Sequence, residues 1–543
     1  MKIVLAEKVS PSTLAVLKEE PGWQIVTADK ITDLPAELAD ADALVVRSAV
    51  QVDEALLEHA PKLRVIGRAG VGVDNIDTAA ATRHGVVVMN TPGANAVAVA
   101  ELTLGLMIAM CRKVPAANSS MHAGKWDKKS LQGTELRGKT LGIVGLGRIG
   151  LEVARRARAF GMTLLGYDPF VAPVIARENG VTLVPVDDIF KESDFLTLHV
   201  GLTSQTEGMI NKQSIAIMKP GIRIINCARG ELIVEEALAE GVSSGKVGGA
   251  ALDVFHKEPL KDSPFFALDN ILLSPHIGGS TDEAQEAIGI QLAHQVRDYL
   301  KLGVVQNAVN VPSLSHEEYV ELAPFIEMAA CLGQFLAHST PGNLENIQIT
   351  YTGRIAQGKT DLVRNAALAG IFAATDPDSA STVNRINAAS VAQERGIRVQ
   401  EDKKEVVSGG AGSVLKLTLH SSEGDTSGSA TVLHGTSPRL LTLDGIDIEA
   451  PLHGTLVVIR NHDVPGVIGR IGTVLGEQGL NIANFALGRA GDRTATTTQR
   501  VPQGQALAVV QIDAPSRQQA NAALESLRRI EAIASARLVD LGK

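Results

Sequence analysis

Short apolar runs alternate with helix-like segments along the first part of the chain. In residues 1–98, strand-like runs rich in branched residues occur at Lys2–Ala6, Gln24–Thr27, Ala43–Val46, Arg64–Ile66 and Val86–Met89. This alternation predicts a parallel sheet with helices on its faces. Because ligands bind outside the carboxyl ends of such strands, the polar loops that follow them are candidate binding segments.

A second series of alternating elements begins at Thr140. The run Thr140–Val144 leads into Gly145-Leu-Gly-Arg-Ile-Gly150, and a helical pattern follows over 151–160. The next strand-like run, Thr163–Tyr167, ends in Asp168. A G-x-G-x-x-G motif between a strand and a helix, with an acidic residue about 20 positions later, predicts a dinucleotide-binding unit.

Each residue of this unit has a distinct physical task. Gly145 allows the tight turn, Gly147 lets the backbone approach a pyrophosphate, and Gly150 lets the helix pack closely on its strand. Asp168 can accept hydrogen bonds from ribose hydroxyls, and its charge would repel a 2′-phosphate. No arginine follows it, so the sequence favours NAD over NADP.

Three charged residues follow three later strand-like runs. Arg229 comes after Ile222–Asn226, Glu258 lies five residues beyond Gly249–Asp253, and His276 comes after Ile271–Ser274. Since the carboxyl ends of parallel strands meet at one edge of a sheet, these side chains are expected to converge on the cofactor crevice. Taken singly, each has a plain alternative as a surface ion pair, a loop carboxylate or a strand cap.

Together the three residues fit the oxidation of a 2-hydroxy acid. A histidine can remove the hydroxyl proton while a carboxylate fixes its tautomer and stabilises the imidazolium. An arginine can hold the substrate carboxylate through two hydrogen bonds. In the first sheet, Arg47 and Arg68 stand in loops facing the same crevice, with solvated loop ends as the alternative.

The character of the chain changes after Pro312. Residues 313–452 carry strand-like runs and a helical stretch over 362–374, but no assembled active-site motif, and Ser408–Ser413 predicts a glycine-rich turn. From Thr455 the pattern follows a β-α-β-β-α-β order, which is typical of a ferredoxin-like fold. Such a small module attached to an enzyme indicates a sensor or a dimerisation module.

Composition narrows the possible functions. The chain of 543 residues is too long for a single hydrophobic core. At about 150 residues per domain, we expect three or four domains. The net charge of −9 argues against nucleic acid or an anionic membrane as partner. The three cysteines are far apart and no zinc spacing occurs, so we expect no metal. The apolar stretch Ala96–Cys111 is too short to span a membrane, so we expect a buried helix and a cytoplasmic protein.

These motifs resemble the D-isomer-specific 2-hydroxyacid dehydrogenase family. The resemblance rests on the glycine loop, Asn226–Gly230, Ala251–Pro259 and Ser274–Gly279, with Val46–Ala49 and Gly67–Asn75 earlier in the chain. It implies Arg229, Glu258 and His276 as catalytic residues. Besides the glycine loop and Asp168, it implies NAD contacts at Val71, Arg148, Ile149, Val200, Cys227, Ala228, Asp253, Gly278 and Gly279. Substrate contacts are expected at Arg47, Ser48, Gly70 and Asn95.

The two carboxyl-terminal segments narrow the resemblance to the long-form branch that oxidises 3-phospho-D-glycerate with NAD for serine synthesis. This branch implies an α/β fold with a flavodoxin-like substrate domain (1–98 with 283–312) and a doubly wound Rossmann-type NAD domain (99–282). An α+β, anion-binding intervening domain (313–452) and a ferredoxin-like ACT domain (453–543) would follow. Homodimers or homotetramers are also implied.

The resemblance places an L-serine effector at Asp463 and Asn481. Some relatives carry tyrosine or histidine where this chain has Asn461, which leaves the strength of serine inhibition open. Two other functions also stay open. One is a hydroxypyruvate or glyoxylate reductase, which has no evident use for the last two segments, and the other is a non-enzymatic NAD-sensing binding protein.

Overall fold

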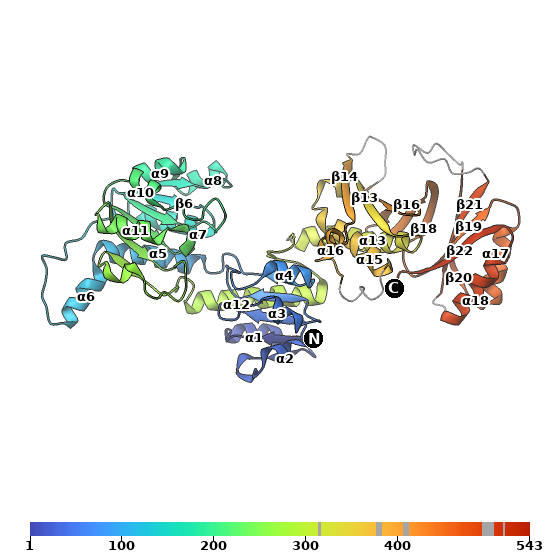
Figure 1. Ribbon diagram of the computed structural model, residues 1–543, viewed down its shortest axis with the longest axis horizontal. Helices are drawn as coiled ribbons and strands as arrows, with labels where there is room; N and C mark the ends of the chain where they lie inside the picture. Colours follow the sequence, from blue (N-terminus) through green and yellow to red (C-terminus); the bar gives the residue numbers. More distant parts are fainter. Residues whose placement is uncertain (313–315, 376–382, 405–411, 491–503, 514–515, 543) are drawn as a thin grey trace.

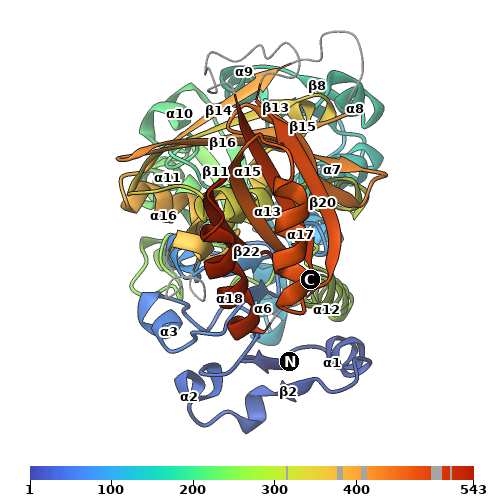
Figure 2. The ribbon, with the colours of Figure 1, turned by 90° about the vertical axis from the view of Figure 1, so that its right-hand side faces the viewer.

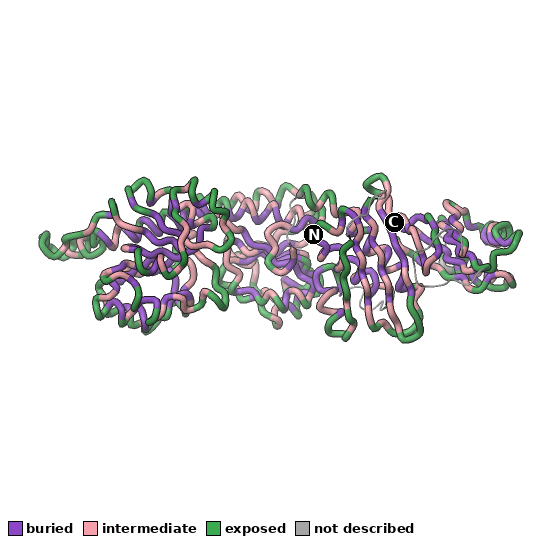
Figure 3. Tube along the Cα trace, turned by 90° about the horizontal axis from the view of Figure 1, so that it is seen from above, coloured by how far each residue is buried: buried purple, intermediate pink, exposed green. Residues whose placement is uncertain are grey.

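The computed structural model describes residues 1–312, 316–375, 383–404, 412–490, 504–513 and 516–542. The described chain is elongated and carries four sheets, which follow one another along its long axis (Figure 1). Sheet 2 lies at one end, sheet 1 and then sheet 3 follow, and sheet 4 lies at the other end. Buried positions run through the interior of each part (Figure 3). The turn expected at 408–413 falls largely outside the described residues.

Sheet 1 has the order β2-β1-β3-β4-β5, and all its neighbouring strands are parallel. Its strands are β1 Lys2–Leu5, β2 Gln24–Val26, β3 Ala43–Val46, β4 Val65–Arg68 and β5 Val87–Met89. One face packs against α2 Leu34–Leu38, α3 Glu54–Glu58 and α4 Thr78–Arg83, and the other against α1 Pro11–Lys18 and α12 Asp282–Leu302. The short η1 (Ala28–Lys30) links β2 to α2.

Local signals explain where these helices begin and end. The carboxylates of Asp53 and Asp77 accept the backbone N–H groups of the first turns of α3 and α4. Thr281 caps α12 in the same way, and this helix ends at Gly303, whose φ of 71° is left-handed. The chain therefore returns to sheet 1 through a capped helix, as the sequence indicates.

Sheet 2 is also parallel, with the order β12-β11-β10-β9-β6-β7-β8. Its strands are β6 Thr140–Val144, β7 Thr163–Tyr167, β8 Val181–Leu183, β9 Phe195–Leu198, β10 Ile222–Asn226, β11 Val247–Leu252 and β12 Ile271–Leu273. The core on one face includes α5 Ala96–Cys111, α7 Arg148–Ala159 and α8 Pro173–Glu178. The core on the other includes α9 Val186–Glu192, α10 Lys212–Ile217, α11 Glu235–Ser243, η2 Gly230–Leu232 and η3 Pro264–Ala267. Helix α6 (Val114–His122) projects away with no buried residue.

Sheet 3 has the order β14-β13-β15-β16-β17-β18 and is antiparallel except for the β13–β14 pair. Its strands are β13 Leu344–Thr352, β14 Arg398–Lys404, β15 Val414–Ser421, β16 Gly424–Leu433, β17 Ser437–Leu443 and β18 Ile446–Pro451. Its helices are α13 His316–Ala337, α14 Arg354–Gln357, α15 Asp361–Thr375 and α16 Ala388–Glu394. Residues Glu317–Ala337 of α13 are long and apolar enough to cross a membrane, but they pack against α15 and the sheet.

Sheet 4 has the antiparallel order β20-β21-β19-β22. Its strands are β19 Thr455–His462, β20 Ile482–Arg489, β21 Gln505–Ile512 and β22 Ile533–Asp540. Helices α17 Val467–Glu477 and α18 Arg517–Arg528 lie side by side on its outer face (Figure 2). The other face joins the core of sheet 3, so the two sheets share one hydrophobic cluster.

Candidate functional site

The glycine loop between β6 and α7 leaves open space at one position and close contacts at the two others. Gly145 has a φ of 94°, and a Cβ there would lie 2.5 Å from the carbonyl oxygen of His199. A Cβ on Gly150 would lie 2.0 Å from the carbonyl oxygen of Gly145. Gly147, the residue before α7, has nothing within 4 Å of a Cβ position. The start of α7 is thus accessible to an anionic group.

Asp168 stands at the end of β7 beside this loop. Its Oδ2 accepts the N–H of Leu146 at 2.8 Å, and its Oδ1 accepts the N–H groups of Phe170 and Val171 at 2.8 and 3.1 Å. A hollow of about 370 Å³ adjoins Asp168 and is also lined by Leu183 and Val184. A fixed carboxylate next to a partly apolar hollow suits an adenosine group.

Glu258 and His276 form a direct contact at the carboxyl edge of sheet 2. The imidazole Nδ1 lies 2.7 Å from Glu258 Oε2, and Glu258 Oε1 accepts the N–H of Phe255 at 3.1 Å. The side chain of His276 is half exposed, and its backbone has a left-handed φ of 52°. This conformation is unusual for a residue other than glycine, and it requires support from the surrounding loop.

Asp253 supplies much of that support. Its side chain is fully buried, and its Oδ1 accepts the Ser274 hydroxyl at 2.6 Å and the Ile277 N–H at 2.9 Å. Its Oδ2 accepts the N–H of Gly278 at 2.8 Å. Asp253, which the resemblance implies as a cofactor contact, thus holds the loop that presents His276.

Arg229 follows β10, the strand next to β11. Its Nη1 donates to the carbonyl of Ala228 at 2.8 Å, and its Nη2 lies 3.2 Å from Asp74 Oδ2. A Cβ on Gly230 would lie 1.9 Å from the backbone carbon of Phe255, so the Arg229 loop presses directly on the Glu258 loop. The arrangement thus places all three expected catalytic residues on adjoining loops of neighbouring strands.

The loop after β3 is shaped by Glu7. The Glu7 carboxylate accepts the N–H groups of Arg47, Ala49 and Val50 at 2.8 to 3.3 Å. The Arg47 guanidinium lies 3.4 Å from the carbonyl of Lys8, and Ser48 is exposed. Arg47 and Ser48 are therefore accessible at the carboxyl edge of sheet 1.

The last residue of β4 is Arg68, whose role the sequence left undecided. Its guanidinium lies against Gly70, where a Cβ would stand 1.5 Å from Nη1, and its buried Nε has no hydrogen-bond partner. Burial and then the positive charge of Arg229 lower the pKa of Arg68, with a smaller contribution from Arg47. The guanidinium groups of Arg47, Arg68 and Arg229, which come from two sheets, thus lie close enough to influence one another.

The segments that join the two parallel sheets also carry expected site residues. Arg148 Nη1 donates a short hydrogen bond to the carbonyl of Pro92, which follows β5. Asn95 precedes α5, its Oδ1 is buried without a partner, and its side chain lies beside Gly279. Arg148 therefore links the glycine loop to the connection between the sheets.

The other expected NAD residues occupy nearby loops. They are Val71 after β4, Ile149 in α7, Val200 after β9, Cys227 and Ala228 after β10, and Gly278 after β12. Burial raises the pKa of the Cys227 thiol to about 12, so this cysteine is not a nucleophile at neutral pH. Within the described residues, no group of three or more His, Cys, Asp or Glu side chains is placed to hold a metal.

The expected effector residues lie at two ends of sheet 4. Asn461 is buried near the end of β19, and its Oδ1 has no partner. Asp463 Oδ2 is 3.4 Å from Arg489 Nε, and Asn481 donates to Asp513 at 2.7 Å. These three residues make no hydrogen bond with one another among the contacts of the described residues.

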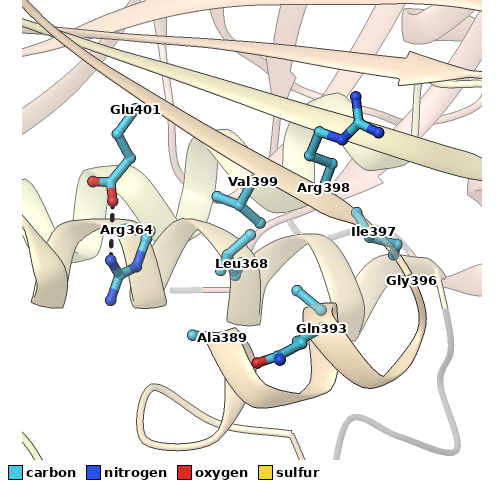
Figure 4. A pocket seen from close by; sticks show the side chains of 10 residues that line it. Arg364, Leu368, Ala389, Gln393, Gly396, Ile397, Arg398, Val399 and Glu401 are labelled. Atoms are coloured by element: carbon cyan, nitrogen blue, oxygen red, sulfur yellow. Dashed lines mark hydrogen bonds and ion pairs between the residues drawn. The ribbon is translucent and has the colours of Figure 1, made fainter.

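A separate hollow of about 470 Å³ occurs in the part around sheet 3. It lies between α15, α16 and β14, and Arg364 donates to Glu401 at one end of it (Figure 4). Leu368 and Val399 form its apolar wall. It contains none of the expected dehydrogenase residues, so it is distinct from the site at the edges of sheets 1 and 2.

Three family models match separate segments of the chain. The family model described as D-isomer specific 2-hydroxyacid dehydrogenase, NAD binding domain, matches residues 104–278. The D-3-phosphoglycerate dehydrogenase intervening domain matches residues 321–444, and the ACT domain matches residues 455–529. The fold and the site therefore define an NAD-dependent dehydrogenase of the D-2-hydroxyacid class with an attached regulatory domain.

Relatives that match nearly the whole chain identify the family within this class. The chain is 41% identical over 490 residues to D-3-phosphoglycerate dehydrogenase of Methanocaldococcus jannaschii, covering 90% of this chain and 92% of the relative. It is 38% identical over 543 residues to that of Archaeoglobus fulgidus, covering 100% of both. The chain belongs to the D-3-phosphoglycerate dehydrogenase family.

A solved structure supports the fold of the first two sheets. D-lactate dehydrogenase from Aquifex aeolicus, complexed with NAD and lactic acid, matches with a TM-score of 0.51 and 28% identity. The match covers 58% of this chain and 100% of that protein. The resemblance, the α/β fold class and NAD as cofactor are therefore confirmed.

Proposed function

We propose that this chain oxidises 3-phospho-D-glycerate to 3-phosphooxypyruvate with NAD, the first step of phosphorylated L-serine biosynthesis. The observation that carries the proposal is the Glu258–His276 contact of 2.7 Å beside Arg229 at the edge of the NAD-binding sheet. The names of the full-length relatives supply the substrate.

The three residues divide the reaction among them. With its Nδ1–H directed to Glu258, His276 has a free Nε2 that takes the proton from the substrate hydroxyl. Glu258 holds this tautomer and stabilises the imidazolium that forms. Arg229 holds the substrate carboxylate and orients C2. NAD, when bound, supplies the hydride acceptor.

The protein residues fit this cofactor. Gly147 leaves open space before α7 for a pyrophosphate, and Asp168 faces a hollow suited to adenosine. We assign the pyrophosphate to the loop Gly145–Gly150 and the ribose to Asp168. Among the remaining expected contacts, Val71 lies on a loop of sheet 1, and loops at the carboxyl edge of sheet 2 carry Val200, Cys227, Ala228, Gly278 and Gly279.

We assign the substrate phosphate to the arginines of sheet 1. Arg47 is accessible, and Arg68 is half-buried beside it with an unpaired Nε. Gly70 leaves the room that the Arg68 guanidinium occupies, while Ser48 and Asn95 offer polar atoms on the same side. A phosphate between two guanidinium groups gains charge-assisted hydrogen bonds.

Substituting Arg47→Ala tests the phosphate assignment. We expect the KM for 3-phospho-D-glycerate to rise by about tenfold or more, because one charged hydrogen bond contributes about 1.5–3 kcal/mol. The KM for unphosphorylated D-glycerate should change little. Lys18→Ala, at the exposed end of α1, is the matched control for lost surface charge. Equal rises for both substrates would contradict the assignment.

We further propose that sheet 4, the ACT domain, binds L-serine as an inhibitor. The buried Asn461 has an unpaired Oδ1, and the Asp463 carboxylate lies on the loop that leads to α17. Asn481, the other expected effector residue, precedes β20 at the opposite end of sheet 4, so one serine bound at Asp463 does not reach it. Isothermal titration of serine into wild-type protein and Asp463→Ala tests this, since equal affinities would exclude Asp463 as an effector ligand.

The expected four-domain division, homo-oligomer and cytoplasmic location are proposed with this function. We place the boundaries at 98, 282, 312 and 452, with 283–312 returning to the first domain. Exposed apolar side chains on and after α6, among them Val114, Met121 and Trp126, support association of copies through the NAD domain. Light scattering of the purified chain tests this, and a monomer would contradict it.

A further inference from the structure

Asp74 contacts a residue of the other sheet across the crevice. It lies in the loop after β4 of sheet 1, and its Oδ2 is 3.2 Å from Arg229 Nη2, which follows β10 of sheet 2. The Asp74 side chain is 68% exposed, whereas that of Arg229 is 26% exposed. The ion pair therefore joins an exposed surface carboxylate to a largely enclosed guanidinium.

The Arg229 guanidinium makes one further hydrogen bond and lies close to the backbone of sheet 1. Its Nη1 donates to the carbonyl of its neighbour Ala228 at 2.8 Å. Its Nη2 lies over the backbone of Gly72, where a Cβ would stand only 2.0 Å from the nitrogen. Because the group is planar, the contacts with Ala228 and Asp74 set the plane of its donors.

Asp74 also lies between two positive charges. Arg229 lowers the pKa of the half-buried Arg68, and Asp74 is the largest influence that opposes this effect. Without the Asp74 carboxylate, Arg68 and Arg229 would repel each other across the crevice. The same carboxylate thus offsets this repulsion and orients Arg229.

Neighbouring polar residues of the loop have separate tasks. Asn75 donates to the carbonyls of Arg47 and Val50, and Asp77 accepts the N–H of Ala80 at the start of α4. These contacts hold the loop within sheet 1. The contact of Asp74, in contrast, is directed at a residue that we assign to the substrate.

We propose that Asp74 is the positioning residue for Arg229, holding its guanidinium across the crevice so that its free N–H groups face the substrate carboxylate. The proposal rests on the proposed function for the role of Arg229. It differs from a simple blocking role, in which Asp74 would occupy the place of the substrate and its removal would strengthen binding.

A double-mutant cycle tests this coupling. We expect Asp74→Asn to lower kcat/KM for 3-phospho-D-glycerate by about tenfold or more, because a rotated guanidinium misplaces C2. In an Arg229→Lys background, the same substitution should cost little, since the planar group is already absent. Asp74→Glu, which restores the charge, should recover part of the loss. Additive losses, or a rise in kcat/KM, would overturn the proposal.

Two controls separate this proposal from its alternatives. Asp77→Ala removes a helix cap from the same loop, so it should lower the melting temperature while leaving KM nearly unchanged. Oxalate binding to the NADH complex reports carboxylate recognition without turnover. If the wild type oxidises no 2-hydroxy acid, the proposed function fails. If Asp74→Asn binds oxalate as tightly as the wild type, the Asp74 proposal fails independently.

Discussion

The contact between Glu258 and His276 is the residue-scale feature on which turnover depends. Replacing Glu258 with Gln keeps the size of the side chain but removes the charge that stabilises the imidazolium. We expect kcat to fall by about 100-fold with a small change in KM, because the loss occurs mainly in the transition state. Steady-state kinetics with 3-phospho-D-glycerate measure both constants. An unchanged kcat would exclude Glu258 from catalysis.

His199 gives a pH dependence of stability. Burial lowers the pKa of this histidine to about 4, and its Nδ1 has no partner. Below pH 6.5 the unfolded chain binds a proton that the folded ring does not bind until about pH 4. Stability should therefore fall as pH decreases through this window, by at most about 3 kcal/mol.

The comparison of wild type with His199→Gln measures this effect. Denaturation at pH 7 and pH 5 should show a smaller acid loss in the variant, which has no titrating ring. His59→Gln, at an exposed histidine that follows α3, serves as the control. If wild type and His199→Gln lose equal stability between pH 7 and pH 5, His199 does not cause the loss of stability at acid pH.

Sequence motifs locate the site residues but not all of their contacts. Arg229, Glu258 and His276 could be found because each follows a strand whose carboxyl end faces the crevice. The roles of Asp253 and Asp74 depend on how separate loops pack, and nothing in their own segments indicates this. The burial of Arg68 likewise depends on loops of both sheets. The sequence therefore could not distinguish the environment of Arg68 from that of Arg47.

At the scale of elements, the close approach of β20 to β18 joins sheet 4 to sheet 3. A Cβ on Gly488 would lie 2.3 Å from the backbone oxygen of Asp447 and 2.7 Å from Ile446. We expect Gly488→Ala to destabilise this half of the chain by about 1–3 kcal/mol through overpacking. Gly476 lies in α17 with nothing near its Cβ position, so Gly476→Ala should stabilise the helix by up to about 1 kcal/mol.

Scanning calorimetry distinguishes the two substitutions. The unfolding transition of the part that contains sheets 3 and 4 should move down for Gly488→Ala and slightly up for Gly476→Ala. Dehydrogenase activity should persist in both, since neither residue contacts sheets 1 or 2. Two equal shifts would show that the β18–β20 approach is not tight in solution.

The elements that the sequence predicts well are those with long apolar runs. Strands β1 to β5 and the strands of sheet 2 other than β8 match their runs closely, because strands buried on both faces are continuously apolar. The three-residue β8 was not predicted. Strand β14 carries Glu401–Lys404 at the edge of its sheet, where charged side chains are tolerated and disfavour aggregation. Such a charged segment lacks the apolar alternation that predicts a strand.

At the scale of the whole molecule, the segment that leads into α16 joins the part around sheet 3 to sheet 1. Asn384 and Asn387, before this helix, donate to the carbonyls of Gly85 and Arg83 at 2.9 Å, and Ile386 enters the core of sheet 1. The Asn384→Ala, Asn387→Ala double variant should loosen this junction and speed amide exchange in α4 and β5. Asn179→Ala, in the NAD-binding part, is the control.

The expected outcome is a change confined to the junction. Hydrogen exchange measured by mass spectrometry should rise for residues 78–89 in the double variant and stay unchanged in the control. Unchanged exchange in the double variant would show that these two side chains do not hold the parts together.

The long-range arrangement was only partly contained in the sequence pattern. In β19, the run Leu456–Ile459 is apolar at every position, which is a signal of burial on both faces. The structure shows the covering layers, with α17 and α18 on one face and the core of sheet 3 on the other. Such a run is typical of two-sided burial, but it does not identify the partner surface.

The central claim is that the site at the edges of sheets 1 and 2 oxidises a phosphorylated 2-hydroxy acid with NAD. The most direct test is the initial rate of NADH formation from 3-phospho-D-glycerate, compared with the rates from D-glycerate and glycolate. We expect kcat/KM to be highest for the phosphorylated acid, and the His276→Asn variant to lose nearly all turnover. Equal or higher kcat/KM for the unphosphorylated acids, or full activity in His276→Asn, would contradict the account.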